Sequence, residues 1–202
     1  MQLEVSNLYP IPIGKTHYPN KISKKELNYA LTCEIRNNVG NTTSIDKTVL
    51  ERKEFKKLKT FCEESVNLFY QRTMRPKDPA KLYITQSWVN VCEKDQHHHK
   101  HHHPNSVYSG VFYIQADPNL DKISFCNPSK FFLYQIPESY TVWNSQVWEM
   151  PACTGILYMF PSSFEHEVPK SKNPNKRISL SFNTWVKGEF GHIDESTYLN
   201  LK

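Results

Sequence analysis

Between Lys81 and Trp185, seven short segments repeat a two-residue alternation of side-chain character. They are rich in β-branched and aromatic residues and are bounded by Pro, Asn and Gly, a pattern typical of β-strands joined by turns. We expect strands at residues 82–92, 107–115, 122–126, 141–148, 155–160, 164–168 and 177–185. This many short strands in about a hundred residues predicts an all-β core, either a double-sheet jelly roll or a small barrel.

Two helices are predicted before this β-rich region. Ser23 and Glu26 have the spacing of a capping box, which marks the start of a helix. The apolar residues that recur every four positions after it are Leu27, Leu31 and Ile35. Residues with this spacing lie on one face of a helix, so the first helix is expected over residues 24–36.

The second helix is expected to be longer. Thr48 and Glu51 repeat the capping pattern just before it. Its apolar face is formed by Phe55, Leu58, Cys62, Ser65 and Phe69. The opposite face carries Lys53, Lys56, Lys57 and Lys59, which we interpret as a solvated surface, with an anion-binding surface as the alternative.

Length and composition indicate one domain spanning residues 1–202. Residues 1–80 would provide an extended segment and packing helices, and residues 81–190 the β core. With 38% hydrophobic and 13% aromatic residues, the chain is too rich in large side chains to be disordered. No apolar run approaches the roughly 20 residues that a bilayer requires, and no signal peptide is recognisable, so we expect a soluble protein without a membrane partner.

Charge and cysteine content indicate the compartment and the partners. The net charge of +5 is spread over the chain, which weakly favours acidic partners but does not indicate a nucleic-acid site. The five cysteines include no C-x-x-C pair, and their number is odd. We therefore expect reduced, mostly buried thiols and a cytoplasmic location.

Six of the nine histidines lie between His97 and His103. In an extended backbone His101 and His103 point to one face and His102 to the other, so the first two could bind one divalent cation. The alternative is an exposed polar loop that binds metal only adventitiously.

The C-terminal half contains a further histidine and an arginine in an unusual position. His166 follows a buried strand and a Pro-Ser turn. Alternation along residues 177–183 places Arg177, Ser179, Ser181 and Asn183 on one face and Ile178, Leu180 and Phe182 on the other. An arginine that faces inward needs an anion, and its planar fork suits a carboxylate, so this face is expected to form the wall of a ligand site.

Five blocks in this order resemble a known family. They are Ser87-Trp-Val-Asn90, His101-x-His103-Pro-Asn-Ser106, Ser109-Gly-Val-Phe-Tyr-Ile114, Phe160-Pro-Ser-x-x-x-His166-x-Val168 and Arg177-Ile-Ser-x-Ser-Phe-Asn183. Together they resemble a family of 2-oxoglutarate- and iron(II)-dependent oxygenases found in marine bacteria and their phages and related to the prolyl 4-hydroxylases. The resemblance implies a mainly β protein with N-terminal helices, folded as a double-stranded β-helix of the jelly-roll, cupin-like type.

The same resemblance implies the site residues. His101, His103 and His166 would be the catalytic iron(II) ligands, and Arg177 with Ser179 would bind the 2-oxoglutarate cosubstrate. Families of this type usually hold iron with two histidines and one carboxylate, whereas this chain has His-x-His where His-x-Asp is expected.

Several alternatives for the ligand set stay open. A carboxylate could still come from Asp95, Glu165 or Glu167. The first pair could also be His99 with His101, or His103 with Asn105. Four aromatic residues could line the pocket, and each is also a plausible core residue: Trp88, Tyr108, Tyr113 and Trp185. Asn90, near the end of its strand, could contact the cosubstrate or the substrate.

The implied function is a dioxygenase that consumes dioxygen and 2-oxoglutarate, hydroxylates an unidentified substrate, and releases succinate and CO2. It would act in the cytoplasm, or in the host cytoplasm if phage-encoded. The main alternative is a non-catalytic, cupin-like metal-binding protein, which would not require an inward arginine. A structural or nucleic-acid-associated protein with a decayed site is a third possibility. Substrate choice is expected to depend on the loops at 117–122 and 127–140.

Overall fold

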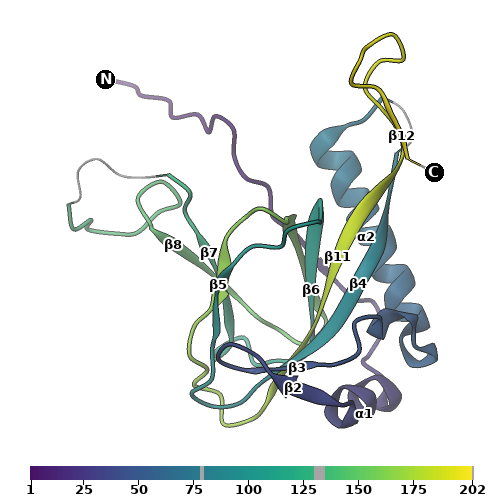
Figure 1. Ribbon diagram of the computed structural model, residues 1–202. Helices are drawn as coiled ribbons and strands as arrows, with labels where there is room; N and C mark the ends of the chain where they lie inside the picture. Colours follow the sequence, from purple (N-terminus) through teal and green to yellow (C-terminus); the bar gives the residue numbers. More distant parts are fainter. Residues whose placement is uncertain (78–79, 130–134, 202) are drawn as a thin grey trace.

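A computed structural model describes residues 1–77, 80–129 and 135–201 of the protein. Two antiparallel sheets form its β-rich part (Figure 1). The larger sheet has the order β1 (Gly14–His17), β9 (Ile156–Pro161), β6 (Tyr108–Gln115), β11 (Arg177–Phe190), β4 (Lys81–Cys92), β3 (Thr42–Ser44) and β2 (Ile35–Asn37), and β12 (Leu199–Leu201) pairs with β11. The smaller sheet has the order β5 (His98–His101), β10 (His166–Val168), β7 (Lys122–Cys126) and β8 (Val147–Pro151). The mainly β prediction is confirmed.

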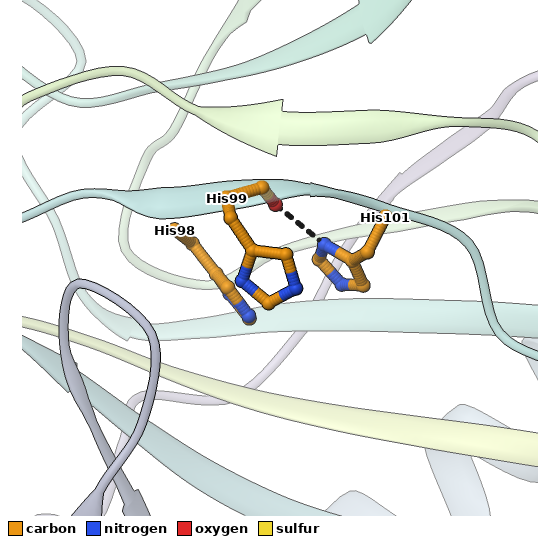
Figure 2. Close-up of side chains that lie close together, drawn as sticks. All are labelled: His98, His99 and His101. Atoms are coloured by element: carbon orange, nitrogen blue, oxygen red, sulfur yellow. Dashed lines mark hydrogen bonds between the residues drawn. The ribbon is translucent and has the colours of Figure 1, made fainter.

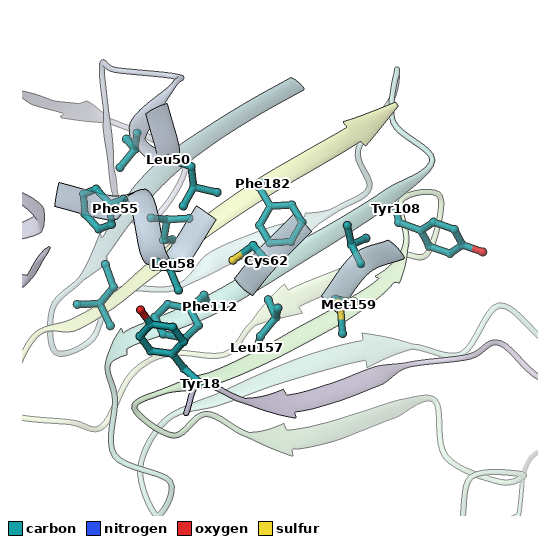
Figure 3. Packing of buried hydrophobic residues seen from close by; sticks show 14 of the residues in the cluster. Tyr18, Leu50, Phe55, Leu58, Cys62, Tyr108, Phe112, Leu157, Met159 and Phe182 are labelled. Atoms are coloured by element: carbon teal, nitrogen blue, oxygen red, sulfur yellow. The ribbon is translucent and has the colours of Figure 1, made fainter. Parts of the chain in front are cut away.

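The larger sheet buries one face against the helices. Helix α2 (Lys56–Met74) lies alongside β4 and β11, and α1 (Lys24–Thr32) lies near the short 3₁₀ turn Lys53–Phe55 (Figure 1). Ile178, Leu180 and Phe182 of β11 pack in the same cluster as Leu58 and Cys62 of α2 (Figure 3). The side chains that alternate with them on β11 therefore point away from the helices, toward the smaller sheet.

The space between the two sheets is apolar in one part and polar in another. Its apolar part contains Tyr158 and Phe160 of β9 and Ile123 and Phe125 of β7. Its polar part is lined by histidines of the smaller sheet and by Arg177 of β11. The two sheets thus enclose a cavity with chemically distinct walls.

The capping box of the first helix is confirmed, but the extent of the helix is not. The Glu26 amide donates to Ser23 Oγ at 3.2 Å, and the Ser23 amide donates to the Glu26 carboxylate at 2.6 Å. The helix ends at Thr32 because Cys33 is extended, and Ile35 lies in β2 opposite Ser44. The predicted apolar face was correct at Leu27, which packs against the core, but wrong at Leu31, which is exposed while Ala30 is buried.

The second helix begins later than the sequence pattern indicates. The Thr48 hydroxyl donates a hydrogen bond to Asp46, and the Thr48 side chain makes no capping hydrogen bond to the residues that follow. Residues Val49–Glu51 form a separate 3₁₀ turn. The predicted cap was therefore wrong. Phe55, Leu58, Cys62 and Phe69 are buried as expected, and the lysine-rich face contacts solvent.

Six of the seven predicted strands are present, the one at 122–126 with its predicted bounds and the other five with shifted ends. The strand predicted at 141–148 is wrong except for its last two residues. Its first residues form a turn in which the Ser145 amide donates to the Thr141 carbonyl at 3.0 Å, and the strand runs from Val147 to Pro151. Part of the predicted substrate loop, residues 130–134, lies outside the described residues. Within the described part of the chain, the helices are too short or too polar to cross a membrane.

Candidate metal centre

Three imidazoles from two strands and one connecting segment converge between the sheets. His101 of β5 and His166 of β10 are paired residues of neighbouring antiparallel strands, and His103 follows two residues after His101. The ligand nitrogens of these three residues all lie within 4.8 Å of one another. His166 is 5% exposed, and the other two are partly buried. The structure thus brings together all three histidines that the sequence singled out.

Each ring is held through its Nδ1 atom. His101 Nδ1 lies 2.7 Å from the His99 carbonyl oxygen, and His166 Nδ1 lies 3.0 Å from the Phe164 carbonyl oxygen. Carbonyl oxygens can only accept, so both Nδ1 atoms carry the proton and donate. The lone pair of each ring is then on Nε2, the state in which a neutral imidazole can bind a metal.

The third ring is held by a chain of side chains on the larger sheet. His103 Nδ1 lies 2.7 Å from Ser109 Oγ, and the Ser109 hydroxyl donates to Asn183 Oδ1 at 2.8 Å. Asn183 Nδ2 in turn donates to Gln86 at 3.2 Å. Because the Ser109 proton is used toward Asn183, His103 Nδ1 is the donor and its Nε2 keeps the lone pair. Ser109 stood in a matched sequence block, but its role was not predicted.

The electrostatics of the cluster favour neutral rings. Burial, together with the neighbouring imidazole of His101, lowers the pKa of His103 to about 4 and that of His166 to about 2. Burial also lowers the pKa of His101 below its ordinary value. At neutral pH all three rings are therefore unprotonated and able to act as metal ligands.

The alternative ligand assignments are less well supported by the geometry. Neither of the two metal-donor groups found among the described residues includes a carboxylate. Glu165 is exposed and pairs with Lys100 at 3.5 Å, and Asp95 is exposed on a turn with positive φ. Asn105 is exposed and also has a positive φ. His99 and His101 do lie together, in a second group with His98.

Arg177 is a buried cation on the opposite wall. It is 2% exposed, and Ser179 and Ser181 from the same face of β11 line the cavity beside it. Within the described part of the chain its Nε atom has no hydrogen-bond partner, and it forms no salt bridge. A buried guanidinium without a partner is costly, so this position is suited to an anionic ligand.

Asp121, a buried acid on the same side of the molecule, forms no salt bridge with Arg177. Asp121 lines an outer cavity together with Arg177. Its carboxylate accepts hydrogen bonds from Asn173 at 2.7 Å, from Asp117 at 3.0 Å and from Ser171 at 3.3 Å. The hydrogen bonds to Asp121 are thus made by other residues, which leaves Arg177 free to bind a ligand.

The expected pocket aromatics divide into two groups. Trp88 and Tyr113 line the cavity, as does Asn90, whose Oδ1 is buried without a hydrogen-bond partner in the described residues. Tyr108 instead packs in the core under the helices, and Trp185 is 39% exposed. Tyr108 lies on the other face of the sheet, and Trp185 lies beyond the buried stretch of β11. The prediction that these two residues line the pocket was therefore wrong.

Sequence comparison places these residues in a known family. A family model described as "Putative 2OG-Fe(II) oxygenase" matches residues 86–183, a range that contains every site residue discussed above. This region belongs to the 2OG-Fe(II) oxygenase family. The protein is thus an oxidoreductase whose family uses iron(II) and 2-oxoglutarate. A search of curated proteins found no match for the oxygenase.

Solved structures show the same fold at low sequence identity. An oxidoreductase of the 2OG-Fe(II) oxygenase family from Burkholderia pseudomallei is 13% identical, with a TM-score of 0.57 over 85% of this chain and 84% of the other. A prolyl-4-hydroxylase from Pseudomonas putida is 12% identical, with a TM-score of 0.53 over 86% and 92%. HygX from Streptomyces hygroscopicus, solved with nickel, 2-oxoglutarate and hygromycin B, is 9% identical, with a TM-score of 0.59 over 86% and 82%. The predicted double-stranded β-helix of the oxygenase is thereby confirmed.

Proposed function

We propose that the protein is an iron(II)- and 2-oxoglutarate-dependent hydroxylase in which His101, His103 and His166 hold the metal and Arg177 and Ser179 hold the cosubstrate. The observation that carries this proposal is the buried Arg177, whose Nε has no partner among the described residues and which lines the same cavity as the three histidines. A group of histidines that only binds a metal ion would not require a buried cation. A site that binds a metal ion together with a dicarboxylate would require one.

The donor set fits iron(II). Imidazole nitrogen is an ordinary ligand for iron, and three rings with anchored Nδ1 atoms present three Nε2 lone pairs. Three neutral ligands leave the full charge of the cation in the cavity. A dianionic cosubstrate would compensate that charge, which supports binding of 2-oxoglutarate next to the metal.

The opposite wall fits the distal carboxylate of 2-oxoglutarate. The Arg177 guanidinium offers a planar pair of donors, and Ser179, 5% exposed, adds a hydroxyl on the same face. Asn90 Nδ2 donates to Ser181 Oγ at 3.2 Å and leaves a free amide oxygen at the cavity wall. These groups would fix the orientation of the cosubstrate before any substrate binds.

The role of the protein is positioning and exclusion of water. When bound, iron(II) with 2-oxoglutarate and dioxygen supplies oxidation of a substrate C–H bond, with succinate and CO2 as coproducts. The Nδ1 hydrogen bonds keep the rings from rotating, and the Trp88 and Tyr113 side chains shield one side of the cavity. The Arg177 side chain would hold the negative end of the cosubstrate away from solvent.

The location of this activity is proposed to be the cytoplasm. All five cysteines are free, which suits a reducing compartment.

A non-catalytic metal-binding protein is the alternative, and substitution of Arg177 separates the two. Arg177→Met replaces the buried cation with an uncharged, unbranched side chain, and the neighbouring exposed Lys176, paired with Glu93 at 3.0 Å, supplies the control Lys176→Met. We expect Arg177→Met to weaken 2-oxoglutarate binding by about 2 to 5 kcal/mol, or about 30-fold to several thousand-fold, with metal content unchanged. Calorimetry on the anaerobic iron(II) protein measures this affinity. Equal 2-oxoglutarate affinity in both variants and the wild type would contradict the proposed function.

A further inference from the structure

A second group of three imidazoles lies next to the proposed iron site. The ligand nitrogens of His98, His99 and His101 all lie within 4.8 Å of one another. The ring centroid of His101 lies 4.3 Å from that of His98 and 5.0 Å from that of His99. Figure 2 shows the three rings gathered on one side of strand β5. Two residues of this group, His98 and His99, have no part in the proposed iron site.

A β-bulge explains why neighbouring residues share one side of the strand. His101 pairs with His166 and His98 pairs with Val168, so two residues of β5 lie opposite the single residue Glu167. Such an extra residue interrupts the usual alternation of side chains. His98 and His101 are three positions apart and would point to opposite faces of a regular strand, yet both line the same cavity.

The two groups compete for one lone pair. His101 Nδ1 is occupied by its hydrogen bond to the His99 carbonyl oxygen, as the dashed line in Figure 2 marks. Only Nε2 of His101 can bind a cation, and both groups need it. Two ions therefore cannot both use His101.

The second group is less well prepared to bind. Asn38 Nδ2 lies 3.3 Å from His98 Nε2, and an amide NH₂ group can only donate, so it occupies a lone pair that a metal would need. His99 Nδ1 is buried and has no hydrogen-bond partner among the described residues. In the iron site, by contrast, all three Nδ1 atoms are anchored. Hydrogen bonds to the second ring nitrogen of a histidine ligand typically raise metal affinity by about 10- to 100-fold, so the second group should bind a metal ion more weakly.

We propose that His98, His99 and His101 form an entry site that captures a divalent transition-metal ion and passes it to the iron site. This inference rests on the proposed function, because it takes His101, His103 and His166 as the final ligands. All three residues of the second group are partly exposed, whereas the iron site includes the buried His166, so an ion arriving from solvent can bind the second group before it reaches His166. His101 Nε2 keeps the ion while His103 and His166 replace His98 and His99, an exchange of neutral ligands that changes no charge.

Zinc loading of the metal-free protein tests the proposal without any turnover. Zn²⁺ is redox-inert, and its transfer from a chromophoric chelator can be followed with time and at equilibrium. The variants are H98A/H99A, which lacks the second group, and H103A/H166A, which lacks the iron site. The control is H102A, because His102 is exposed and belongs to neither group. Thermal unfolding of each variant confirms that it is folded. H99A alone serves if the double variant is unstable.

We expect H98A/H99A to load at least about 10-fold more slowly than the wild type while its final affinity changes little, and H103A/H166A to retain one ion about 10- to 100-fold more weakly. Adding N38A to H103A/H166A should tighten that residual binding, because it releases His98 Nε2. Wild-type loading rates in H98A/H99A and H99A, or no residual binding in H103A/H166A, would overturn the entry site. Undiminished affinity in H103A/H166A would instead count against the iron site itself.

Discussion

The Nδ1 atom of His103 lies 2.7 Å from the hydroxyl oxygen of Ser109, on a strand of the opposite sheet. Ser109 is fully buried, and its hydroxyl donates a hydrogen bond to Asn183 Oδ1. This hydrogen bond fixes both the orientation of the ring and the nitrogen that carries its proton. The proposed metal-binding state of His103 is therefore set by a residue outside the group His101, His103 and His166.

Removal of this hydroxyl should weaken metal binding. Ser109→Ala is expected to lower metal affinity by about 10- to 100-fold, because His103 can then rotate or carry its proton on Nε2. Chelator competition with Zn²⁺ measures the change. Ser163→Ala, at an exposed serine, is the matched control and should bind like the wild type. Full affinity in Ser109→Ala would show that the serine does not position the ring.

Substitution of His103 tests the unusual three-histidine set. His103→Asp keeps a third protein ligand, whereas His103→Ala leaves two protein ligands. We expect iron-dependent formation of succinate from 2-oxoglutarate, without added substrate, to persist at least in part in His103→Asp and to disappear in His103→Ala. Equal succinate formation in the wild type and both variants would exclude His103 as a ligand.

Gly110 should tolerate no side chain, because β6 passes close to Phe182 of β11. A Cβ atom at Gly110 would overlap the Phe182 ring, and that ring is fully buried. We expect Gly110→Ala to lower the free energy of unfolding by about 1 to 3 kcal/mol in urea titrations. Phe182→Leu should make room for the methyl group, so the two changes together should cost less than their sum. Strict additivity would contradict this steric explanation.

Stability at acidic pH should depend on Asp46. Burial by itself would raise the pKa of this carboxyl, but hydrogen bonds from Arg52 Nε at 2.8 Å, Tyr29 Oη at 2.7 Å and the Thr48 amide at 2.8 Å outweigh it and hold the pKa below its ordinary value. A lowered folded-state pKa contributes stability above the unfolded pKa of about 4, and this stability is lost as pH falls toward the folded value.

Asp46→Asn should therefore reduce the free energy of unfolding by about 1 to 2 kcal/mol at pH 7, and the difference from the wild type should shrink below about pH 4. Urea titrations between pH 2 and pH 7 measure both effects. Asp194→Asn, at a carboxylate whose side chain is 84% exposed, is the control and should follow the wild type. A difference that stays constant with pH would rule out ionisation of Asp46 as its cause.

Local patterns in the sequence were sufficient to predict several structural features correctly. The alternation in β11 correctly separated Arg177 and Ser179 from Ile178 and Leu180, because adjacent side chains of a strand point to opposite faces whatever the strand pairs with. The capping box of Ser23 and Glu26 was also correct, since its hydrogen bonds join residues only three apart. Such features are fixed by backbone geometry over a few residues.

Other features were decided by pairing between distant segments. Ile35 continues the apolar period of a helix, but it lies in a strand because β2 pairs with β3, which in turn pairs with β4. Pairing between distant segments also decided the arrangement of the histidine tract. Alternation predicted that His101 and His103 share one face, but it could not predict on which side His98 and His99 lie. Their side of the strand depends on the bulge opposite Glu167, and a bulge is set by the hydrogen bonds of two strands together. The sequence by itself determined which residue types face a ligand, and only the tertiary structure decided which histidines meet, because register is a property of the paired strands.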